Sequence, residues 1–261
     1  MKVAITGAAR GIGFATAKAL KAKGIDVVIG DIDEEAVRAA AAELGVQGEP
    51  LDVTDRASFE RFLAAAGDYD VLVNNAGIMP IGPVLDETDA DARRCIDINL
   101  HGVMLGTKLA LARFIPARRG HVINVASVAG VLPTPGLALY NASKAAVVIF
   151  TEATRQEVKR HGVHVGVVMP SFTNTELIAG TRSPKGQRNC EPEEIAAAVL
   201  SVIGKPRPQT IVPASLTPQI RLMGLVPQAV KDLMSRRLGL DSIFLEFDHS
   251  ARKSYDERIR S

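Results

Sequence analysis

Short apolar runs alternate with longer amphipathic segments over the first 213 residues of the chain. The runs are rich in Val and Ile and end at Gly, Asp, Asn or Pro, a pattern typical of strands buried on both faces of a sheet. Strands are predicted at residues 2–5, 25–31, 46–51, 70–77, 121–127, 163–169 and 209–213. Apolar residues at helical spacing predict helices at 14–20, 34–44, 58–66, 89–112, 140–160 and 192–203. This alternation predicts an α/β domain.

A glycine-rich turn follows the first predicted strand and opens the first helix. Gly7, Gly11 and Gly13 are its glycines, and Ile12 lies between the last two. Glycine lets a pyrophosphate approach the backbone closely, and a helix N-terminus offers unpaired N–H groups with positive dipole character. A glycine turn alone can be purely structural, but a strand–turn–helix context is what a dinucleotide-binding turn requires. We therefore expect this turn to bind the phosphates of a dinucleotide.

Asp31 ends the second predicted strand and bears on which dinucleotide binds. A carboxylate there accepts hydrogen bonds from the adenosine ribose hydroxyls and repels a 2′-phosphate, which favours NAD. Arg10 in the glycine turn is the opposing feature, because a guanidinium can pair with a 2′-phosphate and makes NADP possible. Asp31 is also open to a structural role as a turn or N-cap residue. Asp52 has a similar pair of interpretations, as a partner of the adenine amino group or as a turn residue.

Two consecutive asparagines end the fourth predicted strand. Buried amides must be hydrogen-bonded, so we expect Asn74 and Asn75 to tie neighbouring strands together. Ala76 and Gly77 follow them, and their small size leaves room for a ribose.

Tyr140 and Lys144 are four residues apart in a predicted helix, so they lie on the same face. Tyrosine titrates near ~10, and a nearby ammonium favours the phenolate, so that about 4 kcal/mol would bring its pKa to about 7. Ser127 ends the preceding strand, and its hydroxyl can hydrogen-bond the oxygen that is oxidised or reduced. The Tyr-x-x-x-Lys pattern alone is short, and both hydroxyls could simply be satisfied by neighbours.

Asn99 lies in the predicted helix 89–112, where asparagine is mildly unfavourable. Two interpretations stay open. Its side chain bends the helix around a water that connects Lys144 with solvent, or it is satisfied locally in the core.

The residues after the sixth predicted strand are expected beside the same site. Pro170 leaves the strand, and Thr175 is a candidate hydrogen-bond partner for a nicotinamide carboxamide. Residues 177–189 are polar and contain glycine, proline and basic residues. Loops of this kind next to a cofactor site are candidate substrate lids.

Composition restricts the possible functions. The net charge is +2 and no basic stripe carries interleaved aromatic residues, so nucleic-acid binding is not indicated. Cys95 and Cys190 have neither a disulfide framework nor metal-ligand spacing with a histidine. No apolar run approaches ~20 residues, and a core strand directly follows Met1, without a signal peptide. We therefore expect a cytoplasmic protein with no metal site.

The segment 214–261 differs from the rest of the chain. Residues 216–240 combine apolar and basic side chains, with Val226, Val230 and Leu233 at helical spacing and a stop at Gly239. Such a helix can lie on a membrane surface, but we expect it to pack on its own domain or on a partner subunit. Residues 243–245 are a candidate anchor, and the charged end 252–261 is expected to be a solvated helix or tail.

Together these motifs resemble the short-chain dehydrogenase/reductase family. The matching pieces are Thr6-Gly7-x-x-x-Gly11-Ile12-Gly13, Asp31, Asp52, Asn74-Asn75-Ala76-Gly77, Asn99, Ser127, Tyr140-x-x-x-Lys144 and residues 170–175. They fall in the family's order within residues 1–213. The resemblance implies one doubly wound Rossmann-type domain with a mostly parallel seven-stranded sheet, strand order 3-2-1-4-5-6-7, and helices on both faces. It also implies a homodimer or homotetramer.

The resemblance further implies an NAD-dependent oxidation or reduction of a small-molecule alcohol/carbonyl pair. Its implied catalytic residues are Asn99, Ser127, Tyr140 and Lys144, with Tyr140 as the acid/base. The implied cofactor-binding residues are Gly7, Arg10, Gly11, Ile12, Gly13, Asp31, Asp52, Val53, Asn75, Ala76, Gly77, Tyr140, Lys144, Pro170 and Thr175. The chain departs from the family at Ser171, where glycine is usual, and in 214–261, which has no standard role there.

Two other functions compete with this one. The first is a catalytically silent NAD(H)-binding scaffold or sensor, which would not need the set Asn99, Ser127, Tyr140 and Lys144. The second is a membrane-associated dehydrogenase of the retinoid or steroid type, which would use the C-terminal segment as an anchor.

Overall fold

The computed structural model describes residues 1–184, 188–223 and 225–260. Its centre is a seven-stranded sheet with the order β3-β2-β1-β4-β5-β6-β7, and every neighbouring pair of strands is parallel. The strands are β1 (Lys2–Thr6), β2 (Asp26–Asp31), β3 (Gln47–Pro50), β4 (Val71–Asn74), β5 (His121–Val125), β6 (His164–Pro170) and β7 (Gln209–Val212). The implied sheet order is therefore confirmed.

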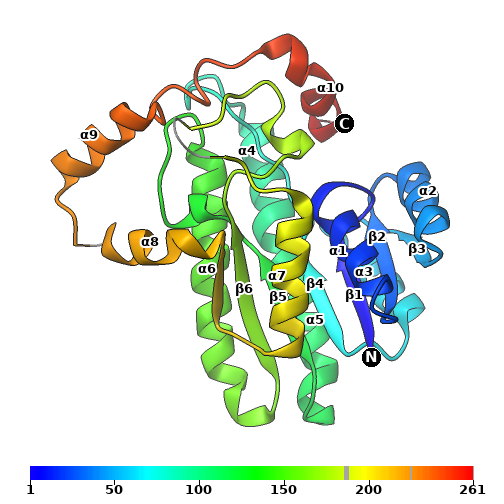
Figure 1. The fold of residues 1–261 in the computed structure, drawn as a ribbon. Coiled ribbons are helices and arrows are strands. Elements are labelled where there is room, and N and C mark those ends of the chain that lie inside the picture. Colours follow the sequence, from blue (N-terminus) through cyan, green and yellow to red (C-terminus); the bar gives the residue numbers. More distant parts are fainter. Residues whose placement is uncertain (185–187, 224, 261) are drawn as a thin grey trace.

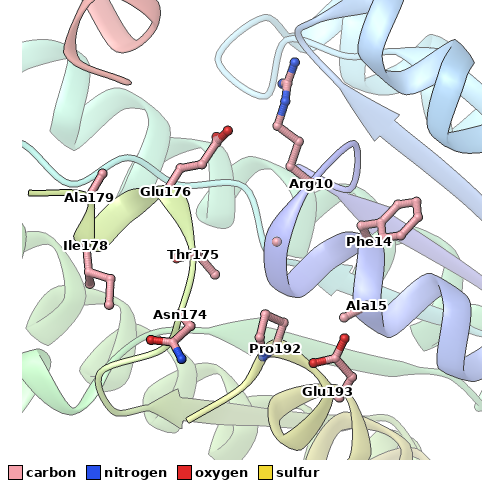
Figure 2. Close-up of a pocket in the computed structure, with 11 residues that line it drawn as sticks. Arg10, Phe14, Ala15, Asn174, Thr175, Glu176, Ile178, Ala179, Pro192 and Glu193 are labelled. Atoms are coloured by element: carbon pink, nitrogen blue, oxygen red, sulfur yellow. The ribbon is translucent and has the colours of Figure 1, made fainter. Parts of the chain in front are cut away.

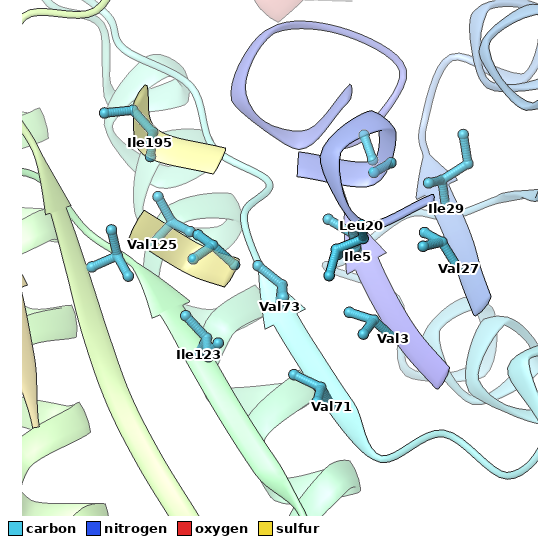
Figure 3. Packing of buried hydrophobic residues seen from close by; sticks show 14 of the residues in the cluster. Val3, Ile5, Leu20, Val27, Ile29, Val71, Val73, Ile123, Val125 and Ile195 are labelled. Carbon is cyan, nitrogen blue, oxygen red and sulfur yellow. The ribbon is translucent and has the colours of Figure 1, made fainter. Parts of the chain in front are cut away.

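Helices cover both faces of this sheet (Figure 1). They are α1 (Gly11–Lys21), α2 (Glu34–Leu44), α3 (Arg56–Ala66), α4 (Asp89–Ile96), α5 (Gly102–Ala117), α6 (Ala138–Val158), α7 (Pro192–Gly204), α8 (Thr217–Met223), α9 (Gln228–Leu238) and α10 (His249–Arg260). Helices α1, α2 and α7 pack on one face, where Figure 3 shows Leu20 and Ile195 beside strand residues. Helices α3, α5 and α6 pack on the other face.

Buried amides connect the middle of the sheet, as expected from the sequence. The Asn74 side chain on β4 donates to Asn124 Oδ1 on β5 at 2.9 Å. Asn124 in turn donates to Thr151 Oγ1 on α6 at 2.9 Å. These bonds fix two strands and one helix relative to each other near the carboxyl end of the sheet.

The helix predicted at 89–112 is confirmed as a continuous helical stretch, and a π-helical turn interrupts its α-helical repeat. Helix α4 ends at Ile96, a π-helical turn occupies Asp97–His101, and α5 continues to Ala117. The irregular turn contains Asn99, whose side chain is fully buried. A π-turn inserts one residue into the helical repeat, and here it directs Asn99 toward the chain that leaves β4.

The amphipathic segment 216–240 forms two helices, α8 (Thr217–Met223) and α9 (Gln228–Leu238). Gly239 ends α9 in the left-handed conformation with φ 70°, as predicted. Helix α9 stands away from the sheet in Figure 1, and it has no buried residue. Leu233 is 51% exposed and Leu225, just before the helix, is 82% exposed, so this stretch does not pack on its own domain.

The expectation of a solvated end at 252–261 is wrong for its first half. Arg252 is fully buried and Tyr255 is 3% exposed, both on α10. The expected anchor is confirmed for Ile243 and Phe244, which are 5% and 1% exposed. Among residues 1–184, 188–223 and 225–260, no helix is long and apolar enough to cross a bilayer.

Candidate active site

The carboxyl ends of the parallel strands place the predicted site residues at one edge of the sheet. The order of the strands reverses between β1 and β4, and in doubly wound sheets the ligand crevice lies at this point. The glycine turn follows β1, Asn75 follows β4 and Ser127 follows β5. The fold thus brings the three predicted motifs to adjacent positions.

The glycine turn requires glycine at specific positions. Gly7 and Gly11 have φ values of 63° and 54°, in the left-handed region. A Cβ at Gly7 would lie 2.6 Å from Ala76 Cα, and one at Gly13 would lie 2.4 Å from Gly7 O. Side chains are therefore excluded where the turn, the start of α1 and the exit of β4 meet, which leaves backbone N–H groups of a helix N-terminus at the surface of the crevice.

Asn75 supports this turn from the neighbouring strand. Its side-chain amide donates to Thr6 O at 3.0 Å and to Gly7 O at 2.8 Å. The Thr6 hydroxyl accepts from the backbone N–H groups of Asn75 and Ala76, both at 3.0 Å. Asn75, expected among the cofactor-binding residues, thus holds the shape of the glycine turn.

Asp31 and Arg10 have different partners at the end of β2. Asp31 accepts from the backbone N–H of Ala9 at 3.0 Å and from that of Asp33 at 3.2 Å. Asp33, not Asp31, is the N-cap of α2 and accepts from Ala36 N. Arg10 forms an ion pair with Asp33 at 2.6 Å. The pKa of Asp33 is lowered most by the hydrogen bond from Ala36 N and next by this pairing with Arg10. Arg10 is therefore neither simply solvated nor unpaired.

Asp52 lies in a turn, in agreement with the structural alternative. Its Oδ1 accepts from Thr54 N at 2.8 Å and from Thr54 Oγ1 at 2.7 Å. The neighbouring Val53 is 7% exposed and packs against Gly102, where an added Cβ would lie 2.8 Å from Val53 Cγ2. Both residues lie beyond the end of β3, on the β2 side of the crevice.

Ser127, Tyr140 and Lys144 meet at the ends of β5 and α6. The Ser127 and Tyr140 hydroxyls are hydrogen-bonded, and Ser127 Oγ also accepts from Ala129 N at 3.1 Å. Lys144 Nζ lies 5.7 Å from the centre of the Tyr140 ring and donates to Val125 O at 3.1 Å. The one-turn spacing on α6 and the end of β5 thus join a phenol, an ammonium and a hydroxyl in one cluster.

Burial decides the protonation of this cluster. It raises the pKa of the Tyr140 phenol, and the hydrogen bond with Ser127 lowers that pKa by less. Burial also lowers the pKa of Lys144 to about 8. Both shifts have the same cause, since desolvation disfavours the charged form of each group.

Asn99 is satisfied by the chain that leaves β4. Its Nδ2 donates to Ile78 O at 2.8 Å and to Ser143 Oγ at 3.0 Å, while its Oδ1 accepts from Ile78 N at 2.8 Å. An added Cβ at Gly77 would lie 3.1 Å from Asn99 Oδ1 and 3.2 Å from Lys144 Nζ. The structure therefore agrees with the locally satisfied alternative and places Asn99 beside Lys144.

Ser171 takes an ordinary backbone conformation. Among the described residues, Arg118 is the only non-glycine residue with positive φ, so Ser171 does not need the glycine that is usual there. Ser171 N donates to Val212 O at 2.8 Å and continues the sheet. Ser127 Oγ donates to Pro170 O at 3.4 Å, which connects this segment with the cluster of Ser127, Tyr140 and Lys144.

A pocket of about 600 Å³ separates the glycine turn from the segment after β6 (Figure 2). Arg10 and Phe14 lie on one side, and Thr175 and Glu176 on the other. The predicted lid at 177–189 begins at this wall, and its residues 185–187 lie outside the described part of the chain. A second hollow, at 156–160, lies at the opposite end of α6 from Tyr140 and contains none of the predicted residues.

The sequence did not identify the apolar side of the site. Tyr140 packs with Met79 and Leu137 and with Ile243 and Phe244 from the C-terminal segment. Phe244 stacks on Phe172 with ring centres 5.6 Å apart. A possible signal was Tyr255, one of the chain's three tyrosines, within an otherwise charged helix.

These residues fit a dinucleotide and no metal ion. The glycine turn excludes side chains where phosphates would lie, and Asp31 stands at the end of the second strand. In residues 1–184, 188–223 and 225–260, no three His, Cys, Asp or Glu side chains are grouped as metal ligands. Cys95 and Cys190 are buried and free.

Comparison with known proteins agrees with this geometry. The protein-family model described as short chain dehydrogenase matches residues 1–186. The probable oxidoreductase EphD of Mycobacterium tuberculosis is 32% identical over 265 residues, which cover 90% of this chain and 45% of EphD. The chain therefore spans about half the length of that relative.

Two further proteins match more evenly in length. The cyclopentanol dehydrogenase of Comamonas sp. is 34% identical over 221 residues, covering 77% of this chain and 88% of that enzyme. The crystal structure of a short chain dehydrogenase/reductase from Burkholderia phymatum in complex with NAD has a TM-score of 0.78 and 25% identity. That match covers 86% of this chain and 93% of the crystallised one.

Proposed function

Because the chain belongs to the short chain dehydrogenase family, we propose that it interconverts a secondary or lipophilic alcohol and its carbonyl with NAD. The observation that carries this proposal is the cluster of Ser127, Tyr140 and Lys144. It lies at the carboxyl edge of the sheet, at the end of β5, two strands from the glycine turn after β1. A dinucleotide bound there would supply the hydride acceptor or donor.

The protein's own residues would control the proton and the substrate's position. Tyr140 accepts the hydroxyl proton in oxidation and donates it in reduction. Ser127, hydrogen-bonded to Tyr140, orients the substrate oxygen beside that phenol. Lys144 lies one turn further along α6 and is placed to bind a ribose next to Gly77. Asn99 fixes the chain around Gly77 through Ile78.

The preference for NAD is proposed from Asp31 and Arg10. The Asp31 carboxylate stands at the strand end where the adenosine ribose is bound in this class of fold. Arg10 is paired with Asp33, so a 2′-phosphate would have to compete with that carboxylate for the guanidinium. Cyclic secondary alcohols are the first substrates to assay, since a relative is a cyclopentanol dehydrogenase.

Calorimetry and turnover together test the proposal. We expect NADH to bind more tightly than NADPH, with the preference lost in Asp31→Ala. Tyr140→Phe should keep NADH binding and lose at least ~100-fold in alcohol oxidation, because acid–base catalysis typically contributes ~10²–10⁴. Tighter binding of NADPH would contradict the cofactor assignment. Binding of NADH without turnover of any alcohol or ketone would favour the silent scaffold instead.

A further inference from the structure

Apolar side chains of the C-terminal segment 240–260 pack in the same buried cluster as Tyr140. Figure 1 shows α10 at the end of the sheet where the strands terminate. Ile243 and Phe244 belong to the same buried cluster as Tyr140, Met79 and Leu137. Tyr140 itself is only 7% exposed. A substrate that reaches the Tyr140 hydroxyl must therefore contact, or displace, side chains from this segment.

Phe244 is held tightly within this wall. It is 1% exposed and stacks on Phe172, which follows β6, with 19° between the ring planes. Its backbone also touches Gly136, where an added Cβ would lie 2.6 Å from Phe244 O. The ring therefore has a fixed position between the segment after β6 and the loop that precedes α6.

Arg252 connects α10 with two loops, one after β6 and one after β4. Its Nη1 donates to Leu177 O at 2.7 Å and to Ala179 O at 3.3 Å, both in the segment after β6. Its Nη2 donates to Met79 O in the chain that leaves β4. Asp256 on the same helix neutralises the charge at 3.0 Å from Nε. A fully buried guanidinium is tolerated only when its donors are used in this way.

Tyr255 makes a second connection one turn further along α10. Its hydroxyl accepts from Met79 N at 2.9 Å, so Met79 is bound through both of its backbone groups. The Tyr255 phenol is also close enough to Tyr140 to act on it electrostatically. At the end of α10, Arg258 pairs with Glu176 and adds a third link to the segment after β6.

We propose that the segment 240–260 is the specificity wall of the active site, with Phe244 limiting substrate size and Arg252 as the positioning residue that fixes the wall. The proposal rests on the proposed dehydrogenase function. The side chains that pack with Tyr140 are apolar, and Arg252 donates through Nη1 and Nη2 to carbonyl oxygens while Asp256 balances its charge. The substrate class is therefore a compact, uncharged alcohol or ketone.

Substrate size is the first test. Wild type, Phe244→Ala and the control Lys253→Ala are assayed with NAD, cyclopentanol and 4-tert-butylcyclohexanol. Lys253 has a 74% exposed side chain on the outer side of α10. Phe244→Ala should raise kcat/KM for the bulky alcohol relative to cyclopentanol by at least ~10-fold, since single pocket contacts give 10–200-fold discrimination. An unchanged ratio in a folded, NADH-binding variant overturns the role of Phe244.

Arg252 is tested by a split between binding and turnover. Arg252→Met should raise KM for cyclopentanol by ~10-fold or more and change kcat less, because Arg252 bonds to loop carbonyl groups and not to Ser127, Tyr140 or Lys144. Arg252→Lys should restore part of the loss, since an ammonium can still donate to the carbonyl oxygens. If kcat falls as much as KM rises, and by the same factor in Arg252→Met and Arg252→Lys, Arg252 has a merely structural role.

Amide hydrogen exchange tests the positioning role of Arg252 without an activity assay. In Arg252→Met, the amides of Ile78, Met79 and residues 177–180 should exchange at least ~10-fold faster than in Lys253→Ala, because the carbonyl groups of these two loops lose the guanidinium that donates to them. If wild type oxidises no alcohol, the proposed function fails, while faster exchange still supports the wall. Equal exchange in both variants overturns the positioning role of Arg252 whatever the activity.

Discussion

At the scale of single residues, burial is the largest cause of the pKa shifts of Tyr140, Lys144 and His121. Lys144 and Tyr140 are shifted toward their neutral forms at the carboxyl edge of the sheet. His121 begins β5 at the opposite edge, and burial, with a smaller effect of His164, lowers its pKa to about 4. Its Nε2 is a buried atom without a hydrogen-bond partner among the described residues.

His121 should therefore make the protein acid-sensitive. The unfolded chain binds a proton at this imidazole below about pH 6.5, whereas the folded protein binds it only near pH 4. Between these values the unfolded state holds more protons, so stability falls as the pH falls. The loss approaches roughly 3 kcal/mol, at about 1.36 kcal/mol per pKa unit. Urea unfolding of wild type and His121→Gln between pH 7 and pH 4 measures it.

The matched control is His101→Gln, at a histidine whose side chain is 61% exposed. The stability of His121→Gln relative to wild type should rise toward low pH, and that of His101→Gln should not. Parallel pH profiles for all three proteins would show that His121 is not the source.

Residue types at fixed spacing were the most predictable part of the site. The glycine turn, Tyr140, Lys144 and Ser127 follow from local patterns, because turn geometry and helical periodicity are set within a few residues. The ion pair of Arg10 with Asp33 and the raised pKa of Tyr140 depend on which groups the fold buries or brings together. The spacing of residues along the sequence therefore does not predict this ion pair or this pKa.

At the scale of elements, the π-helical turn between α4 and α5 fixes the chain that leaves β4 beside the proposed site. The π-turn Asp97–His101 directs Asn99 to both backbone groups of Ile78. Ile78 follows Gly77 and precedes Met79, which carries the contacts to α10. The π-helical turn thus connects the helix that carries Tyr140 and Lys144, the chain at Gly77, and the segment 240–260.

Asn99→Ala should accordingly destabilise the protein. Buried hydrogen-bonding groups of Ile78 and Ser143 lose their partner, at a cost of roughly 1–3 kcal/mol. Urea unfolding measures the difference, with Gln156→Ala as a control, because Gln156 is an exposed amide bonded to Glu152 on the surface of α6. A stability change of less than roughly 0.5 kcal/mol for Asn99→Ala would contradict the role of the turn.

The strands and most helices were predictable because continuous apolar runs and helical stripes record burial directly. The π-turn was not, because a one-residue insertion hardly changes the stripe. The burial of one side of helix α10 was not predicted, for a different reason. Its mostly charged sequence predicts solvent exposure, yet Arg252 is buried by carbonyl oxygens from two loops distant in the chain.

At the scale of the whole molecule, α8 and α9 remain outside the compact part of the chain. Leu222, Leu225 and Leu233 are 59%, 82% and 51% exposed. An isolated helix shorter than ~12–15 residues is marginal in water, and α9 has 11 residues. Because the formal net charge is only +2, electrostatic repulsion between two copies of the protein is weak. We therefore expect a second copy to cover these side chains in a homodimer or homotetramer.

Light scattering after gel filtration tests this expectation. The double substitution Leu225→Glu and Leu233→Glu should shift the protein toward monomer, because it places two carboxylates in an apolar contact. Leu85→Glu is the control, at a leucine that is 93% exposed in the loop before α4. The oligomer should survive that change.

Two results would contradict the assignment of this surface to a second copy. The first is a wild-type protein that is already monomeric at micromolar concentration. The second is an oligomer unaffected by the double substitution. If either is found and wild type also floats with anionic liposomes while the double variant does not, the basic residues Arg221, Lys231 and Arg236 would assign α8 and α9 to a membrane surface. The wall formed by residues 240–260 would stand in both cases, since its contacts lie within one chain.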